Sequence, residues 1–265
     1  MKIGFLGSGK MAEAILASVV NGGICEPWDV TACDVSEERR KLMSDEYGVV
    51  TTADAKEAVA DCKVLVVAVR PQDLDVLLQD VKEELTEKHL VISICAGKTL
   101  KVLRNGIGKK PRLIRVMPNL GLRVNEGMVA YCADKNAKPA DKKLVQKIFS
   151  AAGKVLELAE KHMDAVTALS GSGPAFFAYC LQAMTEGGKK LGLPKDAALL
   201  LAGQTMLGTA VYLQQTGADL AKFIQAVCSK GGTTDAGMQV LAASDVASVY
   251  AATLAAAAKR SAELA

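Results

Sequence analysis

The sequence predicts an α/β domain with a doubly wound, mostly parallel sheet, followed by an all-α domain. Three observations support this division. Short apolar strands alternate with helical segments in the first half, a glycine-rich turn joins the first strand to the first helix, and only helical patterns occur after His162. The 265 residues suit one large domain or two of ordinary size, and half of them are hydrophobic.

The predicted strands are short apolar runs, and the segments between them carry apolar residues at helical spacing. We expect strands at 2–6, 30–33, 64–69, 90–94, 113–116, 127–132 and 154–158, and helices at 11–20, 36–46, 54–60, 73–84, 99–105 and 140–151. Buried strands connected by helical crossovers form a parallel sheet that is covered on both faces.

A dinucleotide-binding turn is the strongest local motif. Gly7-x-Gly9-x-x-Ala12 follows the first strand and opens the first helix, and Asp34 ends the second strand, where the acid that binds a ribose is expected. The alternative is a glycine-rich strand-to-helix turn without a ligand. With its strand and helix context, the motif predicts a Rossmann-like domain.

The choice between NADP and NAD stays open in the sequence. Asp34 is suited to the two ribose hydroxyls of NAD, whereas Arg39 and Arg40 are suited to the 2'-phosphate of NADP. Glu37 and Glu38 are adjacent and can pair with these arginines on an ordinary solvated helix face.

Three later strands also end in loops with polar, glycine or proline residues. These loops are 69–72, 95–97 and 117–119. Because an open parallel sheet binds its ligands beyond the carboxyl ends of its strands, we expect the three loops to surround one crevice. Each loop by itself is also what any strand end contains.

From His162 onward the expected elements are helices at 164–170, 174–191, 195–214, 219–227, 234–243 and 245–263. The segment 197–213 is apolar nearly all round, but Gln204, Thr205 and Thr209 interrupt it, so a membrane span is not expected. A small helical domain rarely buries such a helix alone, and we expect it in a subunit interface.

Two loops of the helical domain have the composition of ligand-binding helix starts. In 228–237, Gly231 and Gly232 allow close backbone approach, and Thr233, Thr234 and Asp235 are expected to cap the helix that follows. An anion fits at such a helix start. The loop 169–175 has a similar glycine and proline content. The alternatives are an ordinary capped loop and a tight interhelical turn.

Composition excludes several other functions. The net charge of +3 and the absence of a basic block argue against a nucleic-acid partner. The seven cysteines have neither zinc nor disulfide spacing, so we expect free buried thiols, no metal, and a cytoplasmic protein without a signal peptide. His89 and His162 are expected at the surface.

Together these motifs resemble the pyrroline-5-carboxylate reductase family over nearly the whole chain. The matching segments are Gly7-Ser8-Gly9-Lys10-Met11-Ala12, Ala68-Val69-Arg70-Pro71-Gln72, Ser93-Ile94-Cys95-Ala96-Gly97, Arg115-Val116-Met117-Pro118-Asn119, Asp164, Thr167-Ala168-Leu169-Ser170-Gly171-Ser172-Gly173-Pro174-Ala175 and Ser229-Lys230-Gly231-Gly232-Thr233-Thr234. The last two are the most specific.

The resemblance implies reduction of the cyclic imine 1-pyrroline-5-carboxylate to L-proline, the last step of proline biosynthesis, by NAD(P)H, with NADP as the first choice and NAD also possible. It implies that Thr234 is catalytic and donates a hydrogen bond to the ring nitrogen. The implied substrate-binding residues are Gly231, Gly232, Thr233, Thr234, Ser172, Gly173, Pro174 and Asn119. The implied cofactor-binding residues are Gly7, Ser8, Gly9, Lys10, Met11, Ala12, Asp34, Val69, Arg70, Pro71, Ala96 and Gly97.

The resemblance also implies the domain organisation and the assembly. Residues 1–160 would form the Rossmann-like dinucleotide-binding domain, and residues 161–265 an all-helical substrate-binding and dimerisation domain. Helices of two subunits would intertwine in a homodimer, which can assemble further, for example into a decamer. Neither nucleic acid nor a membrane is an expected partner.

The sequence departs from the family pattern at Lys10, Arg70, Leu120-Gly121 and Lys230, where Asn, Lys, Thr-Pro and Pro are common. These departures concern affinity and loop rigidity rather than the reaction. A 3-hydroxyacid dehydrogenase is an alternative, but Pro194 stands where its Asn is needed after Lys189 or Lys190. A dinucleotide sensor without turnover is another.

Overall fold

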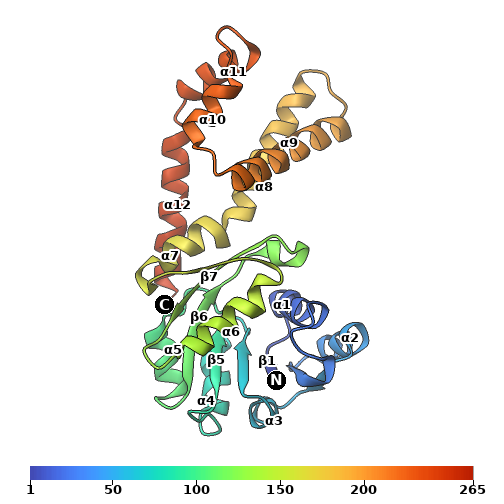
Figure 1. The fold of residues 1–265 in the computed structure, drawn as a ribbon, viewed down its shortest axis with the longest axis vertical. Helices are drawn as coiled ribbons and strands as arrows, with labels where there is room; N and C mark the ends of the chain where they lie inside the picture. Colours follow the sequence, from blue (N-terminus) through green and yellow to red (C-terminus); the bar gives the residue numbers. More distant parts are fainter. Residues whose placement is uncertain (265) are drawn as a thin grey trace. The chain divides into compact units, whose positions relative to one another are not determined.

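The computed structural model describes residues 1–264, and the chain forms two compact units. One unit is Met1–Ser172 with the C-terminal segment from Ala255, and it holds the sheet; the other is Gly173–Leu254, and it is helical (Figure 1). The compact units do not follow the expected boundary between residues 160 and 161, which stays a prediction about the functional domains.

The first unit is built on one eight-stranded sheet in the order β3-β2-β1-β4-β5-β6-β7-β8. Every neighbouring pair is parallel except β6 and β7, which are antiparallel. The strands are β1 (Ile3–Leu6), β2 (Val30–Cys33), β3 (Val50–Thr52), β4 (Val64–Val67), β5 (Leu90–Ser93), β6 (Arg112–Met117), β7 (Gly127–Ala133) and β8 (Gly153–Glu157). The doubly wound, mostly parallel sheet is therefore confirmed.

Helices cover both faces of this sheet, as its fully apolar strands require (Figure 1). One face packs on α1 (Lys10–Asn21), α2 (Glu37–Tyr47) and α6 (Pro139–Ser150). The other packs on α3 (Ala55–Asp61), α4 (Leu74–Val81) and α5 (Leu100–Ile107). Successive strand residues alternate between the two cores: Ile3 and Phe5 face the first, and Leu6 faces the second.

All the expected strands and helices exist, with ends that differ by a few residues. The sequence reading missed β3, a three-residue edge strand beside β2. Val50 on this strand is exposed and no residue of the strand is fully buried, so there is no apolar run to detect.

The second unit consists of helices, as predicted. They are α8 (Gly173–Lys190), α9 (Lys195–Thr216), α10 (Leu220–Val227), α11 (Thr233–Ala242) and the first half of α12 (Val246–Glu263), up to Leu254. The helices α8 and α9 form a hairpin through the turn at Leu193 and Pro194, and Gly188 lets α8 approach Ala198 closely. A short helix α7 (Met163–Val166) and a π-helical turn at Thr167–Gly171 precede α8 in the chain, and both belong to the first unit.

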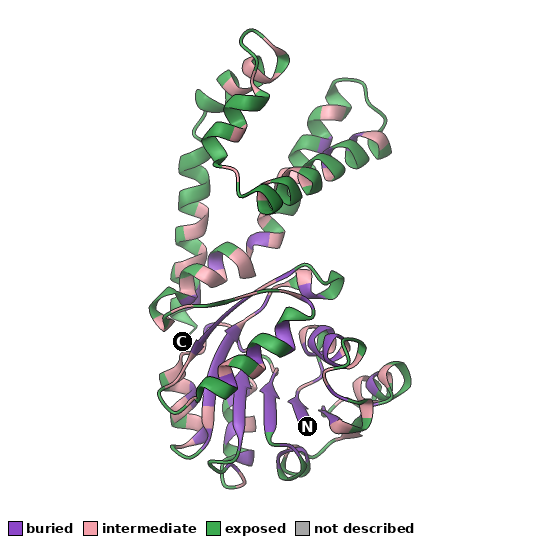
Figure 2. Cartoon of the chain, viewed as in Figure 1, coloured by how far each residue is buried: buried purple, intermediate pink, exposed green. Residues whose placement is uncertain are grey.

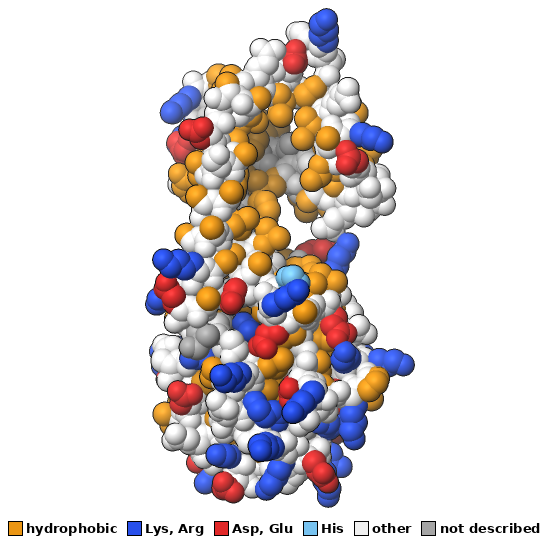
Figure 3. All heavy atoms as spheres, turned by 90° about the vertical axis from the view of Figure 1, so that its left-hand side faces the viewer, with side chains coloured by type: hydrophobic (Ala, Val, Ile, Leu, Met, Phe, Trp, Pro, Cys, Tyr) orange, Lys and Arg blue, Asp and Glu red, His pale blue; other side chains and the backbone are white. Residues whose placement is uncertain are grey.

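The helical unit leaves most of its apolar side chains exposed within one chain (Figures 2 and 3). On α9 only Ala198 and Ala202 are buried, while Leu200 is 70% exposed. Among the described residues, α9 is long and apolar enough to cross a membrane, and the bent pair α11 and α12 passes the same test jointly. An unpartnered apolar helix is what the interface prediction requires.

Candidate active site

The turn between β1 and α1 has the geometry of a phosphate-binding turn. It lies between β2 and β4, where the chain order reverses: the Gly7 N–H donates to Cys33 O at 2.8 Å, and the Ala68 N–H donates to Leu6 O at 2.8 Å. Gly7 has φ +96°, and a Cβ there would lie 2.9 Å from the carbonyl carbon of Ala68. Only glycine fits this position.

The start of α1 presents free backbone donors beyond the carboxyl edge of the sheet. Gly9 caps the helix with an extended backbone, and no described side chain accepts from its first-turn N–H groups. A Cβ at Gly9 would meet no atom within 4 Å, so the space in front of the turn is open. Free N–H groups and the helix dipole suit the pyrophosphate of a dinucleotide, and these residues fit that group.

Asp34 braces the turn from the end of β2. Its Oδ2 accepts from the Ser8 N–H at 2.7 Å and its Oδ1 from the Ser36 N–H at 2.9 Å. The carboxylate is therefore committed to two backbone donors of the protein. A carboxylate has further lone pairs, so the expected contact with a ribose stays a prediction.

Neither arginine at the start of α2 pairs with the adjacent glutamates, contrary to the solvated-face alternative. Arg39 instead forms an ion pair with Glu13 of α1 at 2.7 Å and donates from Nε to Ser8 O at 2.8 Å. Arg40 donates to the carbonyls of Asp34 and Val35. Both cations are held close to the end of β2, where a ribose 2'-phosphate is bound in such folds.

The loops after β4 and β5 end at the same sheet edge as the turn, as expected for adjacent parallel strands. Ala68 touches Gly7, as described, and Val69 and Pro71 are half-buried. Arg70 is exposed and pairs with Asp73 at 2.8 Å. Cys95 is buried beneath this edge, with Sγ 3.4 Å from Val69 O.

The C-terminal end of α12 lies against the loop after β5, a contact that sequence reasoning missed. Gly97 has φ +76°, and a Cβ there would lie 2.6 Å from Cβ of Leu264. Ser261 is buried and donates to Asp164 Oδ1 at 2.8 Å. Nothing local to residue 97 signals this contact, because its partner is more than a hundred residues away.

The side-chain amide of Asn119 stabilises the loop that follows β6, and its oxygen already accepts two hydrogen bonds. Its Oδ1 accepts from the N–H groups of Gly121 and Met128, and its Nδ2 donates to Ser170 O at 3.1 Å. It thereby ties the loop after β6 to the π-helical turn that precedes Ser172. Its role as a substrate ligand stays a prediction.

The loop before α8 is shaped by small residues. A Cβ at Gly171 would lie 2.4 Å from Cε of Met117, so glycine allows the turn to pack on β6. Gly173 and Pro174 open α8, with the Gly173 backbone buried and Pro174 in the first helical turn. Ser172 is half-buried, and among residues 1–264 its hydroxyl has no hydrogen-bond partner.

The structure corrects the details of the loop 228–237. The helix α11 begins at Thr233 and its N-cap is Gly232, so the threonines and Asp235 occupy the first turn and do not cap it. The Gly231 N–H donates to Asp235 Oδ2 at 3.0 Å, and the Gly232 N–H to Ser229 O at 2.9 Å. The family resemblance implies that the backbone N–H groups of Gly231, Gly232 and Thr233 hold the substrate carboxylate, and two of these three donors are therefore occupied.

The free donors of this loop lie slightly further along the chain. The first hydrogen bond of the helix runs from the Ala236 N–H to Gly232 O, which leaves the N–H groups of Thr233, Thr234 and Asp235 unpaired among the described residues. Gly231 has φ +72°, and its turn brings the chain into α11. The anion-binding character expected of the loop is retained, with a shifted set of donors.

The two histidines differ from each other. His162 is exposed, as expected. His89 is buried, and the surface prediction for it is wrong: its Nδ1 accepts from the Thr86 N–H at 2.9 Å, so its Nε2–H donates to Val59 O at 3.2 Å. Polar neighbours in the sequence do not reveal a side chain that turns inward to satisfy backbone groups.

The cysteines are free, and five of the seven are buried. Cys180 and Cys228 of the helical unit are half-buried. No group of three or more His, Cys, Asp or Glu that could hold a metal occurs among the described residues.

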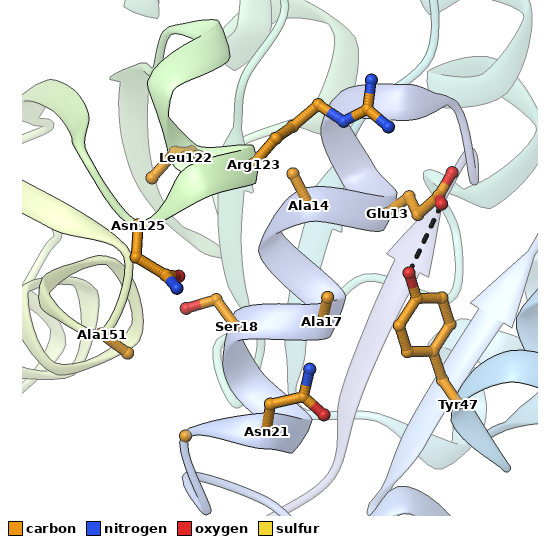
Figure 4. A pocket seen from close by; sticks show the side chains of 11 residues that line it. Glu13, Ala14, Ala17, Ser18, Asn21, Tyr47, Leu122, Arg123, Asn125 and Ala151 are labelled. Atoms are coloured by element: carbon orange, nitrogen blue, oxygen red, sulfur yellow. Dashed lines mark hydrogen bonds between the residues drawn. The ribbon is translucent and has the colours of Figure 1, made fainter. Parts of the chain in front are cut away.

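Two hollows of the first unit are lined by none of the expected site residues. One, of about 350 Å³, lies beside α1 and is bordered by Ser18, Asn21 and Asn125 (Figure 4). There the Tyr47 hydroxyl donates to Glu13 Oε1 at 3.4 Å. The other, of about 1030 Å³, is lined mainly by lysines.

The fold and the turn together define a class: a dinucleotide-binding protein of the Rossmann type with a helical C-terminal region. Two family models match, "NADP oxidoreductase coenzyme F420-dependent" over residues 2–97 and "Pyrroline-5-carboxylate reductase dimerisation" over residues 160–264. The pyrroline-5-carboxylate reductase of Methanosarcina acetivorans is 37% identical to this chain, and the match covers 99% of this chain and 97% of the relative. The chain belongs to the pyrroline-5-carboxylate reductase family.

Solved structures agree with this assignment. A pyrroline-5-carboxylate reductase from Coxiella burnetii superposes with a TM-score of 0.94 at 31% identity, covering 100% of this chain and 98% of that chain. The Plasmodium falciparum pyrroline carboxylate reductase, solved with NADP bound, gives a TM-score of 0.90 at 28% identity over 100% of this chain and 98% of that chain.

Proposed function

We propose that this protein reduces 1-pyrroline-5-carboxylate to L-proline with a reduced nicotinamide dinucleotide. Membership of the family over the full chain is the observation that carries the proposal. The bound dinucleotide supplies a hydride to the carbon of the C=N bond, and a proton reaches the ring nitrogen. The protein has to orient two ligands, and it needs no nucleophile or metal for this reaction.

The residues of the glycine turn hold the dinucleotide in this proposal. The free N–H groups at the start of α1 bind the pyrophosphate, and Gly7, Ser8, Gly9, Lys10, Met11 and Ala12 form the turn. Asp34, Val69, Arg70, Pro71, Ala96 and Gly97 complete the cofactor site along the strand ends.

The first turn of α11 holds the substrate carboxylate in this proposal. The N–H groups of Thr233, Thr234 and Asp235 are the free donors, so they replace the earlier set of Gly231, Gly232 and Thr233. Gly231 and Gly232 shape the loop. The hydroxyl of Thr234 donates to the ring nitrogen, and Ser172, Gly173, Pro174 and Asn119 line the remaining site.

NADPH is the proposed preferred cofactor, with NADH also accepted. Arg39 and Arg40 lie in the first turn of α2, close to the end of β2, and the Asp34 carboxylate accepts from Ser8 and Ser36. The two guanidinium groups attract the 2'-phosphate that NADPH carries and NADH lacks. The ratio of kcat/KM for NADPH and NADH measures the preference.

The protein is a homodimer that acts on a small molecule. The exposed apolar surface of α8 to α12 is the proposed interface. In the dimer, the apolar side chains of α9, which is long and apolar enough to cross a membrane, are buried against a second chain. A larger assembly, such as a decamer, and a cytoplasmic location complete the proposal.

The decisive experiment mixes the purified protein with pyrroline-5-carboxylate and NADPH and follows both NADPH oxidation and proline formation. We expect equal amounts of the two products of the reaction. Tight binding of NADPH without turnover would instead indicate a dinucleotide sensor. In a separate assay with oxidised NADP, reduction of this cofactor by a 3-hydroxyacid would favour the dehydrogenase alternative, in which Lys189, paired here with Glu186 at 2.8 Å, would have to act.

A further inference from the structure

The larger hollow lies at the edge of the sheet opposite the candidate cofactor site. Lys63 immediately precedes β4, Lys88 lies two residues before β5, and Lys109 and Lys110 precede β6. Glu87, Arg112, Asn136 and Lys138 also line the hollow. Because β4, β5 and β6 are parallel, their amino ends converge here, away from the glycine turn.

The hollow concentrates positive charge that the protein neutralises only in part. It has six cationic side chains and one carboxylate, Glu87, whereas the whole chain has a net charge of only +3. Arg112 is paired with Asp141 at 2.6 Å. The five lysines form no ion pair with any described residue. Elsewhere Lys2, Lys56, Lys142 and Lys189 are paired with carboxylates.

The backbone that carries these lysines is held in place. Arg112 donates from Nη2 to Lys88 O at 2.9 Å, which links the ends of β5 and β6. Asn136 donates from Nδ2 to Lys109 O at 3.2 Å. The five exposed lysines thus project from a fixed backbone around one hollow, and together they create a positive potential that attracts an anion.

The lining selects the kind of anion. It contains no aromatic side chain and no Ala, Val, Leu, Ile or Met, and the guanidinium of Arg112 is held by Asp141 and by Lys88 O. The hollow therefore offers little to stack on a base, to bury a peptide's apolar residues or to enter a membrane. Lysine binds phosphate as a point charge, and a single phosphate can engage only some of five lysines on three strand ends. We propose that the hollow binds a linear polyphosphate, either free or as the triphosphate of a nucleotide.

The test is calorimetric titration of the full-length protein with tripolyphosphate, ATP and inorganic phosphate. NADPH is added first in saturating amount, so that the glycine turn is filled. We expect one tripolyphosphate to bind per chain, more tightly than inorganic phosphate, with an affinity that falls as salt rises. The variant with Lys88→Gln, Lys109→Gln and Lys110→Gln should lose about tenfold or more in affinity.

A matched variant with Lys143→Gln, Lys147→Gln and Lys154→Gln removes the same charge from exposed lysines outside the hollow and should bind within about twofold of the parent. Equal losses in both triple variants, or competition between tripolyphosphate and NADPH, would overturn the proposal. So would much tighter binding of a single-stranded oligonucleotide than of tripolyphosphate, because this would mean that bases are recognised. None of these readouts depends on reductase activity.

Discussion

At the scale of single residues, Gly7 and Gly9 of the first turn are glycine for different reasons. Gly7 is required by its backbone, since φ is +96° and Ala68 leaves no room for a Cβ. A Cβ at Gly9 would clash with nothing in the protein, because no protein atom lies within 4 Å of the place where it would stand. Gly7 is therefore explained by the fold, whereas we propose that Gly9 is explained by a ligand.

Replacing each glycine by alanine separates these effects. Gly7→Ala should lower the free energy of unfolding by about 1–3 kcal/mol, because alanine is strained at this φ. Gly9→Ala should change it by less than about 0.5 kcal/mol, yet weaken NADPH binding, since the methyl group enters the space of the pyrophosphate. Urea denaturation and fluorescence titration measure the two quantities. Unchanged NADPH affinity in Gly9→Ala would contradict this view of the turn.

The proposed role of Thr234 depends on its hydroxyl group. Thr234→Ala should lower kcat about tenfold or more, the effect of losing one positioned donor, with no change in the dissociation constant of NADPH. Thr234→Ser keeps the hydroxyl and should retain most of the activity. If Thr234→Ala turns over at the parent rate, solvent supplies the proton.

The buried thiols predict how stability responds to alkaline pH. Burial, followed by the nearby Asp34, raises the pKa of the Cys33 thiol from 9.0 to about 11. Burial raises the pKa of Cys95 to about 11 and that of Cys132 to about 12. A thiol whose pKa is higher in the folded than in the unfolded state contributes to stability. This contribution is fully present below the unfolded pKa of 9.0 and is lost as the pH rises through the pKa of the folded state.

The free energy of unfolding should therefore be level near pH 8 and fall between about pH 9 and 11, as the unfolded chain releases these protons first. Urea titrations across this range measure the slope. Cys33→Ala should reduce the slope, whereas the more exposed Cys228→Ala should leave it unchanged. An equal slope in all three proteins would show that the thiols do not control alkaline stability.

At the scale of elements, one carboxylate holds together segments that are far apart in the sequence. Glu160 accepts from the Leu100 N–H at 2.5 Å, at the start of α5, and lies 3.4 Å from the guanidinium of Arg115 on β6. The Arg115 side chain is only 4% exposed, and its other carboxylate neighbour, Asp164, is 4.0 Å away. Glu160 is thus the closest counter-charge of a buried cation.

Removing this charge should destabilise the sheet unit. Glu160→Gln leaves the buried guanidinium poorly compensated, and we expect a loss of about 1–3 kcal/mol in the free energy of unfolding. The matched change Glu38→Gln removes an exposed carboxylate that has no ion pair among the described residues, and it should cost less than about 0.5 kcal/mol. Urea denaturation at neutral pH compares the two, and equal losses would contradict a specific role for Glu160.

At the scale of the whole molecule, the apolar helices of the second unit require a second chain. Leu200 on α9 and Val76 on α4 are almost equally exposed in one chain, at 70% and 73%. Leu200→Glu places a charge in the proposed interface and should give a monomer by light scattering, because an uncompensated buried charge is costly. Val76→Glu should leave the dimer intact. A dimeric Leu200→Glu protein would locate the interface elsewhere.

Local patterns were sufficient for most of the elements. The apolar strands, the helical spacing and the glycine turn depend on residues adjacent in the chain, and the strand at Val30–Cys33 has the expected ends. The short edge strand β3 was missed because its partner strand, rather than its own composition, makes it a strand. The inward turn of His89 was missed for a similar reason, since Thr86 and Val59 decide it.

The fold class, the dinucleotide turn and the family depend on periodicity and on motifs in a fixed order, and could therefore be predicted from the sequence. Which donors are free could be learned only from the three-dimensional arrangement: the Gly231 N–H donates to Asp235, and Asp34 accepts from Ser8 and Ser36. This arrangement also places the lysines before β4, β5 and β6 around one hollow. The physical reason is that hydrogen bonds and charges act through space, between groups that the sequence keeps far apart.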